Sequence, residues 1–352
     1  MRSWYSMAIF IGAGLLAALV IGFQRDLLFA RWDYDAEQEG LKDRIILKFS
    51  HVVAENTPKG LAAEHFSRLV AEKTNGRVEV QVFPNGMLHS EETEVQALQS
   101  GEIQMIAPAV SNLSAVNPVW SALDLPYLFW DQEEMNRGLS GPIGTILFRS
   151  LEEYNMKGLA FWNNGFKQMT SRRGPLYVPH DFAGQRFRII PSKVLAAQMQ
   201  ALDAVPVPMG FNEVYRELES GRIDGEENTI SNIASRRLYQ FQRNMTLSNH
   251  GYLGYAVVTS KPFWEKLPPD VRSSIEEAMK ETTAWSNEQA MQLNEAELAN
   301  IRQNTALVIH QQTPEEREQW LRAFEPLYKQ FAPELGEDLM REINRLHARR
   351  AR

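Results

Sequence analysis

The chain has 352 residues, of which 44% are hydrophobic and 23% charged, as in globular proteins, and this length favours two domains. Its net charge of -7 argues against a nucleic-acid partner, which requires a basic face. The chain contains no cysteine, which excludes disulfides, thiol catalysis, thiolate metal sites and a lipid-modified amino-terminal cysteine.

The pattern of the amino-terminal region predicts an export segment. Arg2 precedes an apolar run over residues 7–23, which is typical of a secretory signal or a short membrane anchor. Ala30 is a candidate last residue of a cleaved signal, although Leu28 occupies a position that prefers a small side chain. We therefore predict that residues 1–30 are a signal peptide or membrane anchor and residues 31–43 a polar linker. This predicts a periplasmic protein, whose leader is either removed or retained as an anchor.

Strand and helix patterns alternate along the first half of the globular part. Residues 44–50 form an apolar strand pattern, and residues 58–73 carry apolar side chains at helical spacing. The run RVEVQVF alternates as a strand, a helix is expected around residues 92–99, and EIQMIA is the next strand. This alternation predicts an α/β fold.

The stretch from Gly184 to Asn232 predicts the order strand, helix, strand, helix, strand. Arg188 lies inside the first apolar strand, where its guanidinium must reach water, a partner or a ligand. Pro191 ends that strand, and Ser192 can cap the following helix. Anionic ligands bind at this edge of α/β sheets, but a structural pair with a nearby carboxylate explains Arg188 equally well.

An internal repeat and a long helix pattern indicate how the domains are arranged. The segment FPNG…EVQALQSGEI parallels VPMG…EVYRELESGRI, which favours two similar α/β domains joined by a hinge. Residues 271–303 contain no Gly or Pro and predict a helix roughly 50 Å long, enough to run behind both domains. Thr313, Pro314 and Glu316 predict a capped helix start, and residues 347–352 read as a frayed tail.

Several segments resemble one known family. GQRFRIIPSKVL and DGEENTISN resemble signature segments of substrate-binding proteins from TRAP transporters (tripartite ATP-independent periplasmic transporters). FSHVVAENTPKG, EKTNGRVEVQVFPNG, LDLPYLF, NGFKQM and SNHGYLGYAVVTSK follow in the order shown by the DctP branch, which binds C4-dicarboxylates. The resemblance covers about residues 44–345. It implies a two-lobed periplasmic binding protein fold with a hinge and a long helix spanning both lobes. We predict lobe I over residues 44–164 plus 253–292 and lobe II over residues 165–252 plus 293–352.

The resemblance also implies a set of ligand-binding residues. The planar fork of Arg188 fits a carboxylate, and family members hold the ligand carboxylate with an arginine at this position. Asn228 matches the cleft asparagine of the family, and Phe211 matches an aromatic that packs against the ligand. Lys167 stands where many relatives carry a second arginine, whereas Lys193 is equally compatible with a solvated helix residue. The predicted ligand-binding residues are Arg188, Asn228, Lys167, Phe211, Asn232 and Lys193.

Two residues depart from the family pattern. Glu226 replaces a glutamine and Thr229 replaces a proline. A cleft-facing Glu226 would repel a dianion or accept a bond from a ligand hydroxyl or amine; alternatively, it faces away or pairs with a cation. Ala109 and Asn112 differ from the charged residues of the sialic-acid branch, which disfavours sialic acid.

The sequence therefore predicts a solute receptor that binds succinate, malate or fumarate and delivers it to the small and large integral membrane subunits of a transporter. The seven histidines are scattered, no nucleophile elbow or phosphate loop is present, and we predict no catalytic residue, cofactor or metal. Three alternatives stay open at this point: a receptor for another small organic acid, a ligand-loaded sensor subunit for a membrane kinase, and an extracytoplasmic enzyme using a carboxylate pair.

Overall fold

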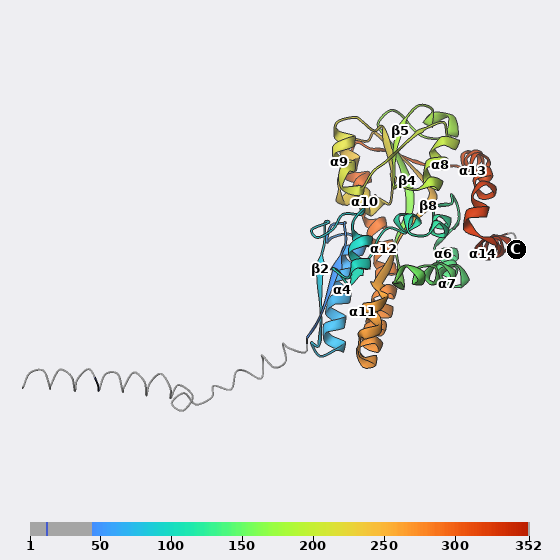
Figure 1. Ribbon diagram of the computed structural model, residues 1–352. Helices are drawn as coiled ribbons and strands as arrows, with labels where there is room; N and C mark the ends of the chain where they lie inside the picture. The colour runs from blue at the N-terminus through green and yellow to red at the C-terminus, as the bar shows by residue number, and fades with distance from the viewer. Residues whose placement is uncertain (1–11, 13–43, 351–352) are drawn as a thin grey trace, which may run out of the picture. The chain divides into compact units, whose positions relative to one another are not determined.

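The fold is built on two long antiparallel strands, β4 (Met156–Ser171) and β8 (Asn244–Ser260), as the computed structural model of the protein shows (Figure 1). The structure describes residue 12 and residues 44–350. The predicted leader and linker, apart from Gly12, lie outside the described residues. Within the described ranges, no helix combines the length and apolar character needed to cross a membrane.

Shorter strands extend the sheet on both sides of this central pair. The order is β2-β1-β3-β8-β4-β7-β5-β6, and β9 pairs with β8 in parallel. Parallel and antiparallel pairs are mixed, and the α/β class predicted from the alternating pattern is confirmed. The shorter strands are β1 (Ile45–Ser50), β2 (Val78–Phe83), β3 (Met105–Ile106), β5 (Arg186–Ile189), β6 (Val205–Pro208), β7 (Gly225–Asn228) and β9 (Val308–Gln311).

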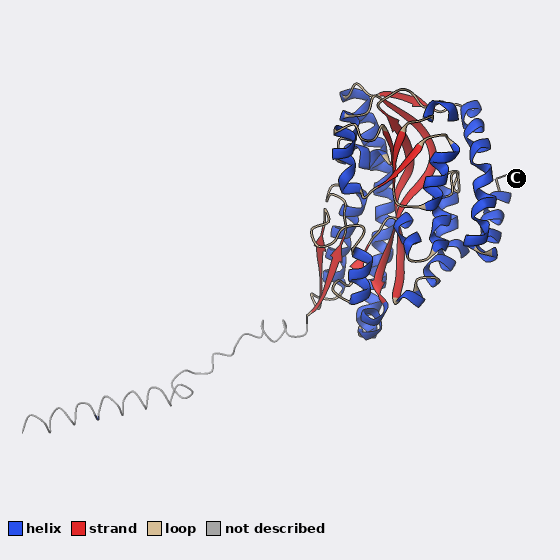
Figure 2. Cartoon of the chain, turned by 45° about the horizontal axis from the view of Figure 1, so that its top comes forward, coloured by secondary structure: helices blue, strands red, loops and turns tan. Residues whose placement is uncertain are grey.

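Helices lie along both sides of the sheet (Figure 2). The α-helices are α4 (Pro58–Lys73), α5 (Glu94–Ser100), α6 (Gln132–Leu139), α7 (Pro142–Arg149), α8 (Lys193–Ala201), α9 (Phe211–Glu219), α10 (Ile230–Ser235), α11 (Lys261–Lys266), α12 (Pro269–Asn304), α13 (Pro314–Leu335) and α14 (Glu337–Ala348). Short 3-10 helices are η1 (Val110–Ala115), η2 (Pro118–Asp124), η3 (Glu152–Tyr154), η4 (Pro179–Phe182) and η5 (Leu238–Gln240).

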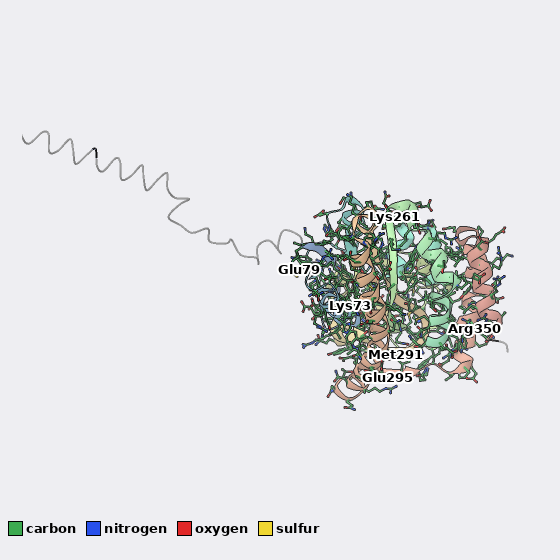
Figure 3. All side chains as sticks on the ribbon, turned by 90° about the horizontal axis from the view of Figure 1, so that it is seen from below. Lys73, Glu79, Lys261, Met291, Glu295 and Arg350 are labelled. Atoms are coloured by element: carbon green, nitrogen blue, oxygen red, sulfur yellow. The ribbon has the colours of Figure 1, made fainter. Side chains whose placement is uncertain are left out.

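The long helix predicted to run behind both domains corresponds to α12, which has 36 residues. It packs against α4 and β4 at one end of the sheet and against α10 at the other, so it contacts both groups of shorter strands and helices. Lys73 at the end of α4 pairs with Glu277 and Glu281 of α12, at 3.2 and 2.7 Å. Figure 3 labels Lys73 and draws its side chain on the ribbon.

Polar side chains of α12 support β4 where its pairing with β8 is irregular. The ladder shifts register between Asn163 and Gly165. There, Asn287 Oδ1 accepts a hydrogen bond from the backbone N–H of Asn163 at 2.8 Å. Asn294 Nδ2 donates to the Asn164 carbonyl at 2.8 Å. These bonds satisfy backbone groups that the sheet leaves unpaired, as buried backbone requires, and they tie the middle of β4 to the helix.

The carboxyl-terminal end follows the sequence only in part. The predicted capping box of α13 is confirmed, because Thr313 Oγ1 accepts from the Glu316 N–H at 3.3 Å and Glu316 Oε2 accepts from the Thr313 N–H at 2.8 Å. The prediction of a frayed tail is wrong up to Arg350. Arg350 pairs with the buried Glu134 at 2.7 Å and donates to the Leu128 carbonyl at 2.6 Å. A buried carboxylate needs a counter-charge, and the tail supplies it.

Candidate ligand-binding site

Arg188 lies near the carboxyl end of its strand, as the sequence predicted. It is the third residue of β5, which runs parallel between β6 and β7, and it is only 1% exposed. The strand ends at Ile189, and Ser192 Oγ accepts from the Leu195 N–H at 3.4 Å, so the predicted cap of α8 is confirmed. The guanidinium therefore lies at the carboxyl end of a strand, next to a helix amino terminus.

The guanidinium of Arg188 is buried without a direct carboxylate partner. Nε and Nη2 donate to the Met209 carbonyl at 3.2 and 3.0 Å, while Nη1 has no hydrogen-bond partner among the described residues. Within that same part of the chain, no carboxylate lies within salt-bridge distance of it. Burial lowers the pKa of Arg188, and the carboxylates of Glu91 and Glu226 act against that shift. Arginine remains charged regardless, so one edge of the fork is available to an anion.

A small cavity of about 20 Å³ lies beside Arg188, with room for about one water molecule. It brings together four of the six predicted ligand-binding residues. Since a four-carbon acid is several times larger than a water molecule, its walls must move apart before such a ligand can enter. The lining residues are Val53, Glu91, Ala109, Arg188, Ile190, Phe211, Asn228, Asn232, Leu253 and Tyr255.

Two asparagines and Glu226 form a connected network at this cavity. Asn232 Nδ2 donates to Asn228 Oδ1 at 2.8 Å, and Asn228 Nδ2 donates to Glu226 Oε2 at 3.1 Å. Glu226 is fully buried and lies opposite Arg188 in the β5–β7 ladder. Its carboxylate lies close enough to Arg188 for their charges to interact. The replacement of glutamine by glutamate is therefore accommodated beside a cation.

The second departure from the family pattern serves the backbone around the site. Thr229, between β7 and α10, is fully buried. Its Oγ1 accepts a hydrogen bond from Asn164 Nδ2 at 2.7 Å. A proline could not accept this bond, so the threonine links the start of α10 to the irregular region of β4.

The structure does not bring either predicted lysine to the cavity. Lys167 Nζ pairs with Glu227 Oε1 at 2.6 Å, and both side chains are buried. His250 Nε2 lies 2.9 Å from the other oxygen of the same carboxylate. Burial by itself would raise the pKa of Glu227, but Lys167 and His250 outweigh burial and lower it to about 2. Lys193 is 77% exposed along its side chain and lies 3.6 Å from Glu334, as expected of a solvated helix residue.

Glu91 and Tyr255 line the cavity but were missed in the sequence. Glu91 Oε2 accepts from the Phe211 N–H at 2.9 Å. The contact forms where the two Pro-x-Gly turns of the internal repeat lie close together in the structure, since a Cβ on Gly86 would meet Asn212 Nδ2 at 3.1 Å. Nothing in the sequence distinguishes Glu91 from its acidic neighbours.

A larger groove of about 790 Å³ runs along α12, beside α6, α7 and β4. Apolar side chains such as Leu139, Phe161 and Met279 form much of its lining, and no buried charged side chain lines it. It therefore lacks the desolvated cation that an organic acid requires. In the described ranges, no cluster of three or more His, Asp or Glu is placed to hold a metal ion.

The buried carboxyl group of Glu226 should make the free energy of unfolding depend on pH. Burial raises its pKa to about 7, against the effect of Arg188. Between its unfolded pKa near 4.5 and about 7, the unfolded chain loses this proton while the folded protein keeps it, so stability falls as pH rises through this window. Glu226→Gln should therefore gain up to about 3 kcal/mol in unfolding free energy over the parent between pH 4 and 8. Urea unfolding of both proteins measures this, and a difference that stays constant with pH would contradict it.

The fold and the cavity together are those of a two-lobed solute-binding protein. Two long strands, β4 and β8, run through the mixed sheet, and α12 contacts elements at both ends of it. The buried Arg188 lies beside Asn228 and Asn232 at a small cavity. The chain belongs to the bacterial extracellular solute-binding protein family 7 (DctP), whose family model matches residues 49–334. This confirms the family predicted from the sequence motifs.

Individual relatives agree with this membership. The chain is 46% identical over 343 residues to the C4-dicarboxylate-binding protein DctB of Bacillus subtilis, covering 97% of this chain and 98% of DctB. A TRAP periplasmic solute-binding protein from Sulfurospirillum deleyianum with bound succinate is 39% identical, with a TM-score of 0.82, covering 86% of this chain and 98% of that one. A homologue from Pseudomonas aeruginosa with bound L-malate is 36% identical, with a TM-score of 0.79, covering 81% and 99%.

Proposed function

We propose that this protein is the extracytoplasmic solute-binding subunit of a TRAP transporter and that it binds a C4-dicarboxylate, namely succinate, malate or fumarate, at Arg188. The observation that carries the proposal is the desolvated guanidinium of Arg188, which has one unpartnered edge in a cavity that it shares with Asn228 and Asn232. The names and bound ligands of the relatives support the choice of acid.

The chemistry of the cavity suits binding rather than turnover. A carboxylate accepts two parallel hydrogen bonds from a guanidinium, and amide groups from the two asparagines add uncharged donors. Phe211 contributes an apolar surface for the carbon chain. We therefore infer a receptor that releases its ligand unchanged.

Binding requires that the two halves of the sheet separate and close. We retain the predicted lobes, with residues 44–164 plus 253–292 in lobe I and residues 165–252 plus 293–352 in lobe II. The α13–α14 pair then connects them, because α13 packs on α8 whereas α14 packs on α6 and α7. Such a connection, together with α12, suits hinge closure around a ligand.

Export and delivery complete the proposal. The globular part would lie outside the cytoplasmic membrane and would pass its ligand to a small and a large integral membrane subunit. The apolar run before the linker and the extracellular family support this location. A periplasmic or extracellular reporter fused after Lys42 should be active, and a reporter that works only in the cytoplasm would contradict this location.

Thermal unfolding with added acids tests the ligand assignment. Succinate, malate or fumarate at about 100 times its dissociation constant should add about 2.7 kcal/mol of stability. Butyrate, which has the same carbon number and one carboxylate, is the matched control and should add less at equal concentration. NMR should recover the bound acid unchanged. If none of the three dicarboxylates shifts the unfolding transition, the proposal is wrong.

A further inference from the structure

Glu91 makes a contact between the two halves of the sheet. It lies in the segment before α5, on the side of β1, β2 and β3, while Phe211 begins α9, on the side of β5, β6 and β7. The Glu91 carboxylate accepts from the Phe211 N–H at 2.9 Å. It thus sits at the amino terminus of a nine-residue helix, where the unpaired N–H groups favour an anion.

Two guanidinium groups lie near the ring of the same residue, Phe211. The Cζ atoms of Arg188 and Arg236 lie 5.9 and 5.2 Å from the centre of the Phe211 ring. Arg188 is 99% buried with Nη1 unpartnered among the described residues, and Nε of Arg236 is buried without a partner. Burial lowers the pKa of both arginines, and in each case Glu91 acts against that shift. One carboxylate therefore accepts from a helix amino terminus and interacts electrostatically with two arginines, of which Arg188 is fully buried and Arg236 partly buried.

We propose that these groups form the second anion subsite, which takes the far carboxylate of a dicarboxylate ligand, and that Glu91 is a resident carboxylate that occupies this subsite until the ligand displaces it. This inference rests on the proposed function and deepens it. It assigns the second ligand charge to the Phe211 N–H and Arg236 rather than to Lys167, whose amine is taken by Glu227.

The place of Glu91 in the cavity wall supports displacement. Glu91 and Arg188 line the same small cavity, so a second ligand carboxylate bound there would lie beside the Glu91 carboxylate unless Glu91 moved away. Two carboxylates at one site would also repel each other. A ligand that must displace a resident anion binds with reduced apparent affinity, and this cost falls only on ligands that need the second subsite. Glu91 thus sets how strongly the site distinguishes dicarboxylates from monocarboxylates.

Calorimetry with succinate and butyrate tests the proposal on two pairs of variants. Glu91→Gln removes the competing negative charge. It should raise the affinity for succinate at least tenfold and change the affinity for butyrate less than threefold. Glu64→Gln is the matched control, because it makes the same charge change on an exposed residue of α4 that does not line the cavity. Arg236→Gln should lower the affinity for succinate at least tenfold and the affinity for butyrate much less. Arg237→Gln is its control, because Arg237 is an exposed neighbour with the same charge. Succinate affinity in Glu91→Gln equal to or weaker than in Glu64→Gln would overturn the proposal.

A measurement without ligand separates this inference from the proposed function. If neither the parent nor Glu91→Gln binds any dicarboxylate, the proposed function and the ligand subsite both fail. The resident role is then judged by small-angle scattering of the ligand-free proteins. Glu91→Ala should have a larger radius of gyration than Glu64→Ala, because the bond to the Phe211 N–H no longer holds the halves together. Equal radii would overturn the resident role even if dicarboxylates bind.

Discussion

Replacing Arg188 by alanine should nearly abolish binding of succinate, at a cost of about 3–5 kcal/mol, or roughly two to four orders of magnitude in affinity. The ligand carboxylate would be desolvated without its fork, and the neighbouring amides of Asn228 and Asn232 carry no charge to replace it. Arg188→Lys should also bind poorly, since an ammonium group cannot present two aligned donors. Isothermal calorimetry at pH 7 measures both variants.

The same strand offers a control for this experiment. Arg186 is two residues away, 44% exposed along its side chain and paired with Asp224 at 3.1 Å. Arg186→Ala should change succinate affinity less than threefold. Because Arg188 also faces the buried Glu226, thermal unfolding should confirm that each variant is folded before binding is compared. Parental succinate affinity in a folded Arg188→Ala protein would show that the site is assigned wrongly.

Replacing Lys167 by alanine should lower the free energy of unfolding by about 3–5 kcal/mol, because it leaves Glu227 buried with one charged partner removed. The effect has a defined pH dependence. Lys167 helps to hold the pKa of Glu227 at about 2, below its usual value, so this stability is present above about pH 4.5 and is lost as pH falls toward 2. Urea unfolding at pH 7 and pH 3 should therefore show a smaller difference between parent and variant at pH 3.

Lys193 provides the matched lysine for this test. Its side chain is 77% exposed, so Lys193→Ala should change the unfolding free energy by no more than about 0.5 kcal/mol. Binding of succinate and butyrate to Lys167→Ala decides whether the predicted ligand role of Lys167 holds. Loss of succinate alone would support that role, whereas equal losses indicate support of the cleft in general. An unfolding free energy within 1 kcal/mol of the parent would contradict the structural role of the pair.

Local signals in the sequence determined most of the secondary structure and the position of Arg188. The limits of α4 match the predicted residues 58–73, and α12 extends the predicted 271–303 by a few residues, because apolar spacing and the absence of Gly and Pro act within one segment. Ser192 and Thr313 cap their helices as predicted, since capping involves residues three positions apart. The family motifs are local in the same sense, so they identified the kind of protein.

The tertiary structure alone decided which charged groups face the cavity. Lys167 and its partner Glu227 are 60 positions apart in the chain, and Glu91 and Phe211 are 120 apart. Neither pairing has a signal at the sequence level, because Asp and Glu are numerous and any of them could meet a buried cation. Arg188 stayed available because β5 places its side chain opposite Glu226 but beyond salt-bridge distance of any described carboxylate. A buried charge takes the partner that folding brings within a few ångströms, and that proximity is set by how strands and helices pack, not by their order along the chain.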